Sequence, residues 1–279
     1  MTILDAAAAG YITLGNDLRV PRLGFGAMHQ TGEGVWGEPA DRPAALQLLR
    51  RAVQLGVRFI DTADAYGPAV SENVIAEALH PYPADLVIAT KGGIVRPDRS
   101  TWASDGRPEH LRAACAASLQ RLRVQRIDLY QLHTIDSRVP LEDSMGELAR
   151  LRQEGNVRHV GVSNFNVEQL ERARRIVPIV SVQNRYNVAD RTSEDVLALC
   201  AREGIAFIPW RPLALAQGDA TKLERQRIEA AARARGWTVP QASLAWLLGH
   251  SDAMLPIPGT SNPAHLEELV AAASLRLSL

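Results

Sequence analysis

The chain has 279 residues, 31 basic and 31 acidic side chains, and a 46% share of hydrophobic residues, so it is neutral overall and can build a large core. A neutral chain without a basic cluster does not attract nucleic acid, and no apolar run reaches the roughly 18 residues of a membrane span. The first ten residues do not resemble a signal peptide, and Cys115 and Cys200 follow no disulfide spacing. We therefore expect one domain over residues 1–279, located in the cytoplasm, with neither nucleic acid nor membrane as a partner.

Short apolar runs alternate with longer helical patterns along the chain. Residues 12–14 and 17–20, joined by Gly15-Asn16, predict a short hairpin. Strands are predicted at residues 23–26, 58–61, 86–90, 127–131, 157–162, 179–182, 205–208 and 254–257. Helices are predicted at residues 43–55, 71–79, 108–122, 141–154, 167–176, 193–203, 222–235, 240–248 and from 263 onward. Eight such units favour an α/β fold, a (β/α)8 TIM barrel with a short N-terminal β-hairpin cap.

An open, doubly wound sheet is the alternative fold. Such a sheet needs no eighth strand and usually carries a glycine-rich phosphate turn after its first strand. Gly24-Phe25-Gly26 begins like that turn, but His29 stands where the third glycine is expected. The pattern therefore favours the closed barrel.

Four polar side chains stand at or just after the ends of predicted strands. Asp61 and Tyr66 follow the second strand, Lys91 follows the third and His133 follows the fourth. Lys91 is unusual because only two of the 31 basic residues are lysines, and lysine is a compact charge suited to catalysis. The carboxyl ends of barrel strands meet at one mouth, so we expect these groups to form one site.

The four side chains have complementary chemistry. A tyrosine hydroxyl is a weak acid, and a nearby ammonium favours its ionised form. We expect Lys91 to lower the pKa of Tyr66, Asp61 to hold Lys91 in place, and His133 to bond a substrate oxygen. Such a polarised proton donor suits the reduction of a carbonyl by hydride from a cofactor.

Several motifs resemble the aldo-keto reductases, in the order in which that family has them. The residues that carry the resemblance are Gly56–Gly67, Thr90-Lys91, Gln131–His133, Gly161–Phe165, Gln183–Asn187 and Ile257–Thr260. The resemblance extends over about residues 12–272 and implies a barrel that uses NADPH without a Rossmann domain. It implies a small carbonyl substrate and places the catalytic tetrad on Asp61, Tyr66, Lys91 and His133, with Tyr66 as the proton donor.

The resemblance also assigns the cofactor site. Ser163, Asn164 and Gln183 match ligands of the nicotinamide carboxamide, and Trp210 matches the aromatic residue that stacks on its ring. Pro212 and Leu213 lead into a loop, through Gly218, that is expected to bind the pyrophosphate. The 2′-phosphate end is assigned to Gly259, Thr260, Ser261, His265 and Glu268, where a turn precedes the last helix.

The adenosine end departs from one branch of the family. Gly259 stands where many relatives carry lysine, and His265 stands where they carry arginine. The loss of two cations weakens the attraction for a 2′-phosphate. We therefore expect NADPH as the preferred cofactor, with NADH as the alternative.

The substrate side is assigned by position alone. Met28, Trp36 and Trp102 lie in loops expected to border the barrel mouth, and residues 92–107 form a long segment that is expected to act as a pocket wall. The run from Gly26 through the Asp61 motif is most similar to bacterial pyridoxal-reductase-like members, which implies a pyridoxal-like substrate. We expect a monomer or a weak homo-oligomer.

Two alternative functions stay open at this stage. Lys91 at a barrel strand end also fits a Schiff-base lyase of the class I aldolase type. A catalytically slow NADPH-binding regulatory subunit is the other alternative. A metal enzyme is not expected, because the remaining histidines lack ligand spacing.

Overall fold

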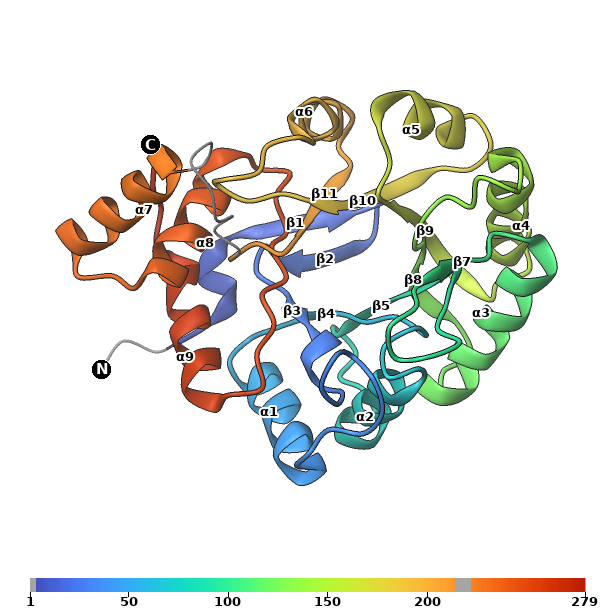
Figure 1. Ribbon diagram of the computed structural model, residues 1–279, viewed down its shortest axis with the longest axis horizontal. Helices are drawn as coiled ribbons and strands as arrows, with labels where there is room; N and C mark the ends of the chain where they lie inside the picture. Colours follow the sequence, from blue (N-terminus) through green and yellow to red (C-terminus); the bar gives the residue numbers. More distant parts are fainter. Residues whose placement is uncertain (1–3, 214–221, 279) are drawn as a thin grey trace.

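The computed structural model describes residues 4–213 and 222–278. Within them, seven parallel strands form one curved sheet in the order β11-β10-β9-β8-β5-β4-β3. The strands are β3 (Phe25–Gly26), β4 (Phe59–Asp61), β5 (Val87–Gly92), β8 (Ile127–Leu132), β9 (Val157–Ser163), β10 (Ile179–Arg185) and β11 (Ala206–Trp210). The surrounding helices are α1 (Arg42–Gln54), α2 (Val70–Leu79), α3 (Pro108–Leu122), α4 (Leu141–Gln153), α5 (Val167–Arg174), α6 (Glu194–Glu203), α7 (Lys222–Arg235), α8 (Val239–His250) and α9 (Pro263–Ala271). Figure 1 looks down the barrel, with the strands at the centre and the helices around them. The predicted barrel is confirmed.

The eighth side of the barrel is an extended segment at residues 254–258. Phe207 of β11 bonds to both ends of the turn into this segment: its N–H donates to Ala253 O, and its carbonyl accepts from Leu255 N–H. On the opposite edge, the amides of Gly24 and Gly26 donate to the carbonyls of prolines 256 and 258. Proline lacks an N–H and interrupts a regular ladder. The segment therefore closes the barrel at the place where the eighth strand, residues 254–257, is predicted. It forms no regular strand there and contributes one isolated bridge, between Phe207 and Met254.

Side-chain alternation along the strands divides the core into two parts. Phe59 of β4 and Val87 and Ala89 of β5 belong to a cluster inside the barrel. Their neighbours Ile60 and Ile88 belong to the larger cluster that faces the helices. Both faces of β4 and β5 are therefore buried, which explains their nearly continuous apolar runs in the sequence.

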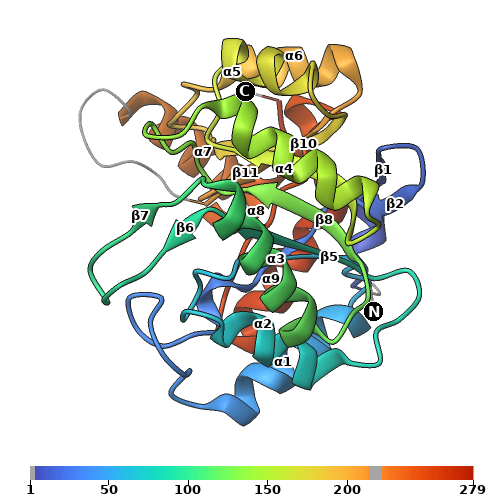
Figure 2. The same ribbon diagram turned by 90° about the vertical axis from the view of Figure 1, so that its right-hand side faces the viewer.

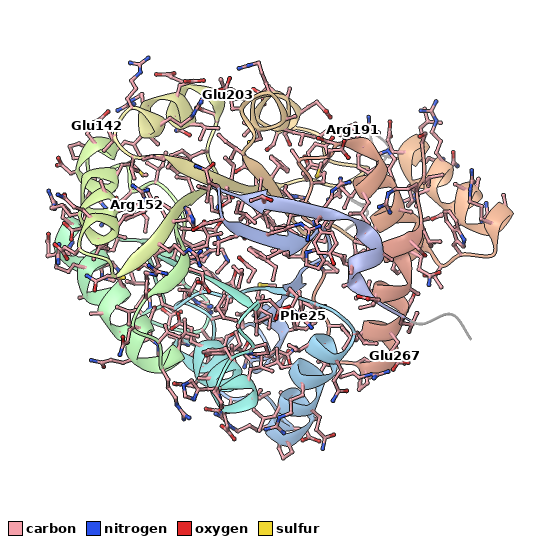
Figure 3. The ribbon with its side chains drawn as sticks, turned by 180° about the vertical axis from the view of Figure 1, so that it is seen from behind. Phe25, Glu142, Arg152, Arg191, Glu203 and Glu267 are labelled. Atoms are coloured by element: carbon pink, nitrogen blue, oxygen red, sulfur yellow. The ribbon has the colours of Figure 1, made fainter. Side chains whose placement is uncertain are left out.

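The N-terminal hairpin closes one end of the barrel. Strands β1 (Tyr11–Leu14) and β2 (Leu18–Pro21) pair antiparallel, as predicted. Leu14, Leu18 and Val20 are buried and extend the interior cluster. Figure 3, seen from behind, shows this hairpin across the barrel, with Phe25 near the centre. The hairpin therefore fills this end and leaves the opposite end for a site.

A second hairpin stands at the opposite end of the barrel and was not predicted. Strands β6 (Ile94–Val95) and β7 (Ala103–Ser104) pair antiparallel within the long segment that follows β5. Figure 2 shows β6 and β7 on one side of the molecule and β1 and β2 on the other. The expected pocket wall at residues 92–107 is therefore an ordered hairpin at the mouth.

Ion pairs connect neighbouring helices on the outside of the barrel. Glu142 of α4 binds Arg172 of α5 at 2.8 Å, and Glu203 of α6 binds Arg174 of α5 at 2.6 Å. Glu142 and Glu203 lie at the outer rim in Figure 3. Exposed pairs of this kind each contribute about 0–1 kcal/mol, so the buried apolar core dominates stability. Among the helices of the described residues, none has the length and apolar character needed to cross a membrane.

Candidate active site

The alternation that fills the barrel interior also places the polar groups at its mouth. In β5, Lys91 continues the inward series of Val87 and Ala89, and in β4 Asp61 continues that of Phe59. His133, directly after β8, continues the inward series of that strand. The period of two in a strand therefore brings these groups from separate strands into one interior layer.

Lys91 lies at the centre of this layer. Its Nζ donates to Asp61 Oδ2 at 2.7 Å and to the carbonyl oxygen of Thr62 at 2.8 Å. The same ammonium lies 3.4 Å from Tyr66 Oη. Lys91 is 0% exposed and Asp61 is 2% exposed, so this pair is shielded from bulk water. The structure thus brings together Asp61, Tyr66 and Lys91 as predicted.

The second oxygen of Asp61 is held by two amides. Gln183 Nε2 donates to Asp61 Oδ1 at 2.7 Å, and Gln131 Nε2 donates to the same oxygen at 3.3 Å. Gln131 was not singled out from the sequence, although its place two residues before His133 on an inward-facing series is a usable signal. These bonds fix the carboxylate that in turn fixes Lys91.

Burial and charge oppose each other at Tyr66. Burial raises the pKa of the Tyr66 hydroxyl, and the ammonium of Lys91 acts against this, but the net pKa lies above the ordinary value. Burial alone would lower the pKa of Lys91, yet Asp61 and Tyr66 raise it above the ordinary value. The expected net lowering of the Tyr66 pKa is therefore not found, because desolvation outweighs the ammonium. Tyr66 keeps its proton and Lys91 its charge near neutral pH.

His133 borders the tyrosine on its other side. The two rings meet edge to face, with centroids 5.9 Å apart and an interplanar angle of 84°. Burial, followed by the charge of Lys91, holds the pKa of His133 well below its ordinary value. Its Nδ1 is buried and has no hydrogen-bond partner among the described residues. His133 is therefore a neutral imidazole beside the Tyr66 ring.

A cavity of about 400 Å³ opens at this mouth. Asp61, Tyr66, Gln183 and Trp210 border it on one side. The other lining residues are Gly26, Met28, His29, Arg211, Pro212, Leu213, Ile257, Pro258 and Gly259. The lining includes Met28, Gln183, Trp210, Pro212, Leu213 and Gly259 from the predicted set. An indole face beside polar amide groups suits a flat ring that bears a carboxamide, so the residues present fit a nicotinamide.

Asn164 supports this cavity without lining it. Its Nδ2 donates to the carbonyl oxygen of His133 at 3.0 Å and to Ser163 Oγ at 3.1 Å. Its Oδ1 accepts from Trp210 Nε1 at 3.0 Å. Asn164 has a left-handed backbone with φ of 63°, which asparagine tolerates better than most residues. Asn164, held by Ser163, therefore connects the backbone of His133 to the indole of Trp210 that borders the cavity.

A smaller cavity of about 130 Å³ continues toward α9. Leu213 and Gly259 line both cavities. Thr260, His265 and Glu268 border the smaller one, whereas Ser261 is exposed beside it. The predicted adenosine end is thus adjacent to the predicted nicotinamide end. The predicted pyrophosphate loop at residues 214–218 lies outside the described residues.

Two arginines at the mouth were missed by sequence reasoning. Arg211 lines the larger cavity, and its guanidinium lies 5.8 Å from the centroid of the Trp210 ring. Arg96 is buried between the two loops that carry Trp36 and Trp102. Trp36 and Trp102 do not line the cavity of 400 Å³, although the Trp102 ring contacts the ring of Tyr66 and Trp36 bridges to Gly67. In a chain with many surface arginines, no sequence signal separates these two from the rest.

The barrel, the buried lysine–aspartate pair beside a tyrosine hydroxyl, and the adjoining cavity are the features predicted for a cofactor-dependent oxidoreductase of the barrel type. The chain belongs to the aldo/keto reductase family, whose model matches residues 22–279. It is 42% identical over 265 residues to pyridoxine 4-dehydrogenase of Escherichia coli, covering 93% of this chain and 91% of that protein. It is 46% identical over 275 residues to an uncharacterized oxidoreductase of Schizosaccharomyces pombe, covering 99% of this chain and 88% of that protein.

A solved structure gives the same family. An aldo-keto reductase from Klebsiella pneumoniae in complex with NADPH matches with a TM-score of 0.79 and 28% identity, covering 96% of this chain and 90% of that chain. The protein is therefore an oxidoreductase of the aldo/keto reductase family, and a solved member of that family binds NADPH.

Proposed function

We propose that the protein reduces a pyridoxal-like aldehyde to its alcohol, with Tyr66 as the proton donor. The observation that carries the proposal is the buried contact of 3.4 Å between Lys91 Nζ and Tyr66 Oη at the edge of the cavity. The likeness to a pyridoxine 4-dehydrogenase supports a pyridine aldehyde as the substrate. The cavity of about 400 Å³ has room for such a ring beside a nicotinamide.

The roles of the side chains follow from their positions. NADPH, when bound, supplies the hydride that reduces the carbonyl carbon. Tyr66 donates its proton to the carbonyl oxygen, and Lys91 stabilises the phenolate that this transfer leaves. Asp61 keeps the ammonium in place, and neutral His133 donates a hydrogen bond that orients the carbonyl oxygen. Because His133 is neutral, it adds no positive charge that would lower the pKa of Tyr66 before the substrate binds.

The residues proposed to hold the cofactor lie around the same cavity. Gln183 and Trp210 would hold the nicotinamide, Gln183 by its amide and Trp210 by its indole face. Ser163 and Asn164 keep Trp210 in position through the bond between its Nε1 and Asn164 Oδ1. Pro212 and Leu213 lead toward Gly259, Thr260, Ser261, His265 and Glu268, the proposed adenosine end.

The geometry speaks against a Schiff-base lyase. A Schiff base needs a neutral, accessible amine, whereas Lys91 is fully buried and shares its ammonium among Asp61, Thr62 and Tyr66. Its raised pKa favours the protonated form, which is not nucleophilic. Borohydride treatment with the aldehyde should leave Lys91 unmodified. A regulatory subunit, in contrast, would bind NADPH tightly and show almost no turnover with any aldehyde.

Substitution of Tyr66 by phenylalanine tests the mechanism. The variant lacks the proton donor but keeps the ring that packs against His133, so we expect turnover to fall by at least about 10²-fold. The assay follows the loss of nicotinamide absorbance with a panel of pyridine, benzene and aliphatic aldehydes. Fluorescence titration should give an NADPH dissociation constant within about twofold of that of the wild type.

Tyr82→Phe is the matched control. Tyr82 donates its hydroxyl hydrogen to the carbonyl oxygen of Leu122, away from the cavity. Loss of that hydroxyl affects stability and leaves turnover unchanged. Wild-type turnover in Tyr66→Phe would remove Tyr66 from the mechanism, and absence of turnover by the wild type with all aldehydes would favour the regulatory subunit.

A further inference from the structure

Arg96 occupies an unusual place for a charged side chain at the barrel mouth. It follows β6 directly, is 7% exposed, and forms no ion pair with any carboxylate of the described residues. Burial lowers the pKa of this arginine, and the nearby charge of Asp98 acts against the lowering. Burial of a cation without a paired anion costs desolvation free energy, so hydrogen bonds and other contacts must offset it.

The hydrogen bonds of Arg96 join two loops that are far apart in the sequence. Its Nε donates to the carbonyl of Thr101 at 3.0 Å, and Nη2 donates to that of Arg99 at 2.6 Å. Its Nη1 donates to the carbonyl of Val35 at 3.1 Å, and Nη2 also reaches that of Gly34 at 3.4 Å. In Figure 2 the loop between β3 and α1 and the β6–β7 hairpin extend on the same side of the molecule. The planar fork of arginine carries five N–H donors spread over three nitrogens, so it can bond carbonyls of both loops at once.

The same guanidinium contacts two tryptophan rings. It lies 3.8 Å from the centroid of the Trp102 ring and 5.4 Å from that of Trp36. Trp36 forms a bridge with Gly67, next to Tyr66. The ring of Trp102 meets the Tyr66 ring edge to face at 6.4 Å, and Trp102 is 44% exposed. One large aromatic surface is therefore both open to solvent and fixed beside the proposed proton donor.

We propose that Arg96 is a specificity-determining residue that positions Trp102 as a stacking wall for planar aromatic aldehydes. A ring aldehyde at Tyr66 would pack against the exposed part of Trp102, while an aliphatic aldehyde has no ring to pack there. Arg96 fixes the indole before the substrate arrives, so less conformational freedom is lost on binding. The inference rests on the proposed function, because it takes Tyr66 as the group that meets the carbonyl oxygen.

The test compares a ring aldehyde with an aliphatic one. Initial rates with pyridine-4-carbaldehyde and with propanal are measured at saturating NADPH for the wild type, Arg96→Met and Arg96→Lys. We expect the ratio of kcat/KM for the ring aldehyde to that for propanal to fall about tenfold in both variants, through KM rather than kcat. Arg96→Lys behaves like Arg96→Met because it keeps the charge but loses the planar fork.

Two further variants separate positioning from general destabilisation. Arg99→Met removes an exposed arginine of the same hairpin that pairs with Glu33, and it should keep the wild-type ratio. Trp102→Leu should lower the kcat/KM ratio as Arg96→Met does. The double variant with Arg96→Met and Trp102→Leu should have the same ratio as Trp102→Leu alone, because both changes remove the same stacking wall. Near-ultraviolet circular dichroism checks that each variant is folded. If Arg96→Met does not fold, the comparison is made with Arg96→Lys.

Three results would overturn the inference. The first is an equal loss of kcat/KM for both aldehydes in the Arg96 variants. The second is a ratio in the double variant that falls by the product of the two single effects, and the third is a change of the ratio in Arg99→Met as large as that in Arg96→Met. Tyr66→Phe is measured in parallel with both aldehydes. If it is inactive while the Arg96 variants keep the wild-type ratio, the inference about Arg96 fails and the proposed function stands.

Discussion

Lys91 shows at the scale of one residue why an arginine-rich chain keeps a lysine. Its Nζ lies within 2.8 Å of two oxygens and 3.4 Å from Tyr66 Oη, in a layer without solvent access. A single nitrogen with three donors can bond all three oxygens from one point. The planar guanidinium of arginine spreads its donors over a larger area and cannot occupy that point.

Lys91→Arg should therefore be almost inactive although the charge is kept. We expect turnover to fall by at least about 10²-fold, because the fork displaces either Asp61 or Tyr66. The measurement is a single-turnover rate with saturating NADPH and a pyridine aldehyde. Lys222→Arg, at the exposed start of α7, is the control and should leave the rate unchanged. A Lys91→Arg rate near that of the wild type would reduce Lys91 to a salt-bridge partner of Asp61.

At the scale of elements, the turn before α9 decides how the far end of the cofactor is held. Asn262 caps this helix, because its side-chain Oδ1 accepts from the backbone N–H of Ala264 at 2.9 Å. The backbone N–H of Asn262 donates to Thr260 Oγ1 at 3.0 Å. Gln30 Nε2 donates to the carbonyl of Thr260 at 2.8 Å and so ties the turn to the loop after β3. Around the smaller cavity, the imidazole of His265 and the carboxyl group of Glu268 are the side chains that a phosphate would meet.

The preference for NADPH over NADH should therefore depend on the side chain at position 265. Arginine is always charged and bonds phosphate through its planar fork, so His265→Arg should bind the 2′-phosphate more tightly than the wild type does. We expect the ratio of the NADH dissociation constant to the NADPH dissociation constant to grow in His265→Arg and to fall in His265→Leu, which loses the hydrogen bonds of the imidazole. Fluorescence titrations with both cofactors give the constants.

One control completes the cofactor experiment. Glu268→Gln removes an acidic side chain from the same cavity, so it should strengthen NADPH binding. Equal affinities for NADPH and NADH in the wild type and in His265→Arg would show that this turn does not recognise the phosphate.

At the scale of the whole molecule, the interior of the barrel wall holds charges that the mechanism does not use. Glu72 is fully buried and accepts from Thr90 at 2.6 Å and from Arg121 at 2.6 Å. Asp64 lies close by, and one of its oxygens is buried without a hydrogen-bond partner among the described residues. Burial, followed by the charge of Glu72, raises the pKa of Asp64 to about 8. Asp64 is therefore mostly protonated in the folded protein at neutral pH.

This shift predicts how stability depends on pH. A carboxyl whose pKa is raised by folding stabilises the protein fully below the unfolded value near 3.8, and this contribution is lost as the pH rises through about 8. In the Asp64→Asn variant the side chain stays neutral at every pH. The free energy of unfolding of the variant relative to the wild type should therefore rise between pH 5 and 8, by up to about 1.4 kcal/mol per pH unit.

Urea unfolding at pH 5, 6, 7 and 8 measures this difference, and Asp98→Asn is the control. Asp98 is exposed and its pKa is lowered to about 2 by bonds from Ser100 and Thr101, so it is ionised in both states over this range. Its substitution should change stability by a constant amount. A constant difference for Asp64→Asn as well would mean that Asp64 is ionised in the folded protein.

The barrel and much of its mouth could be predicted because they depend on local patterns. Apolar runs of four to six residues define the predicted strands and their carboxyl ends. Asp61, Lys91 and His133 stand at such ends, so their meeting follows once the strands are parallel and adjacent. The hairpin at residues 11–21 was equally visible because its turn residues and alternation are contiguous.

Other features depended on groups that only tertiary structure brings together. The β6–β7 hairpin has two-residue strands, too short for a periodic signal, and Arg96 acquires its contacts from loops more than 60 residues apart. The bonds of Gln131 and Gln183 to Asp61 join separate strands. The direction of the Tyr66 pKa depends on burial, which no local pattern reports. The sequence by itself determined which chemical groups stand at the strand ends, and the tertiary structure decided which of them touch and how much water surrounds them, because contact and desolvation arise only when distant segments pack.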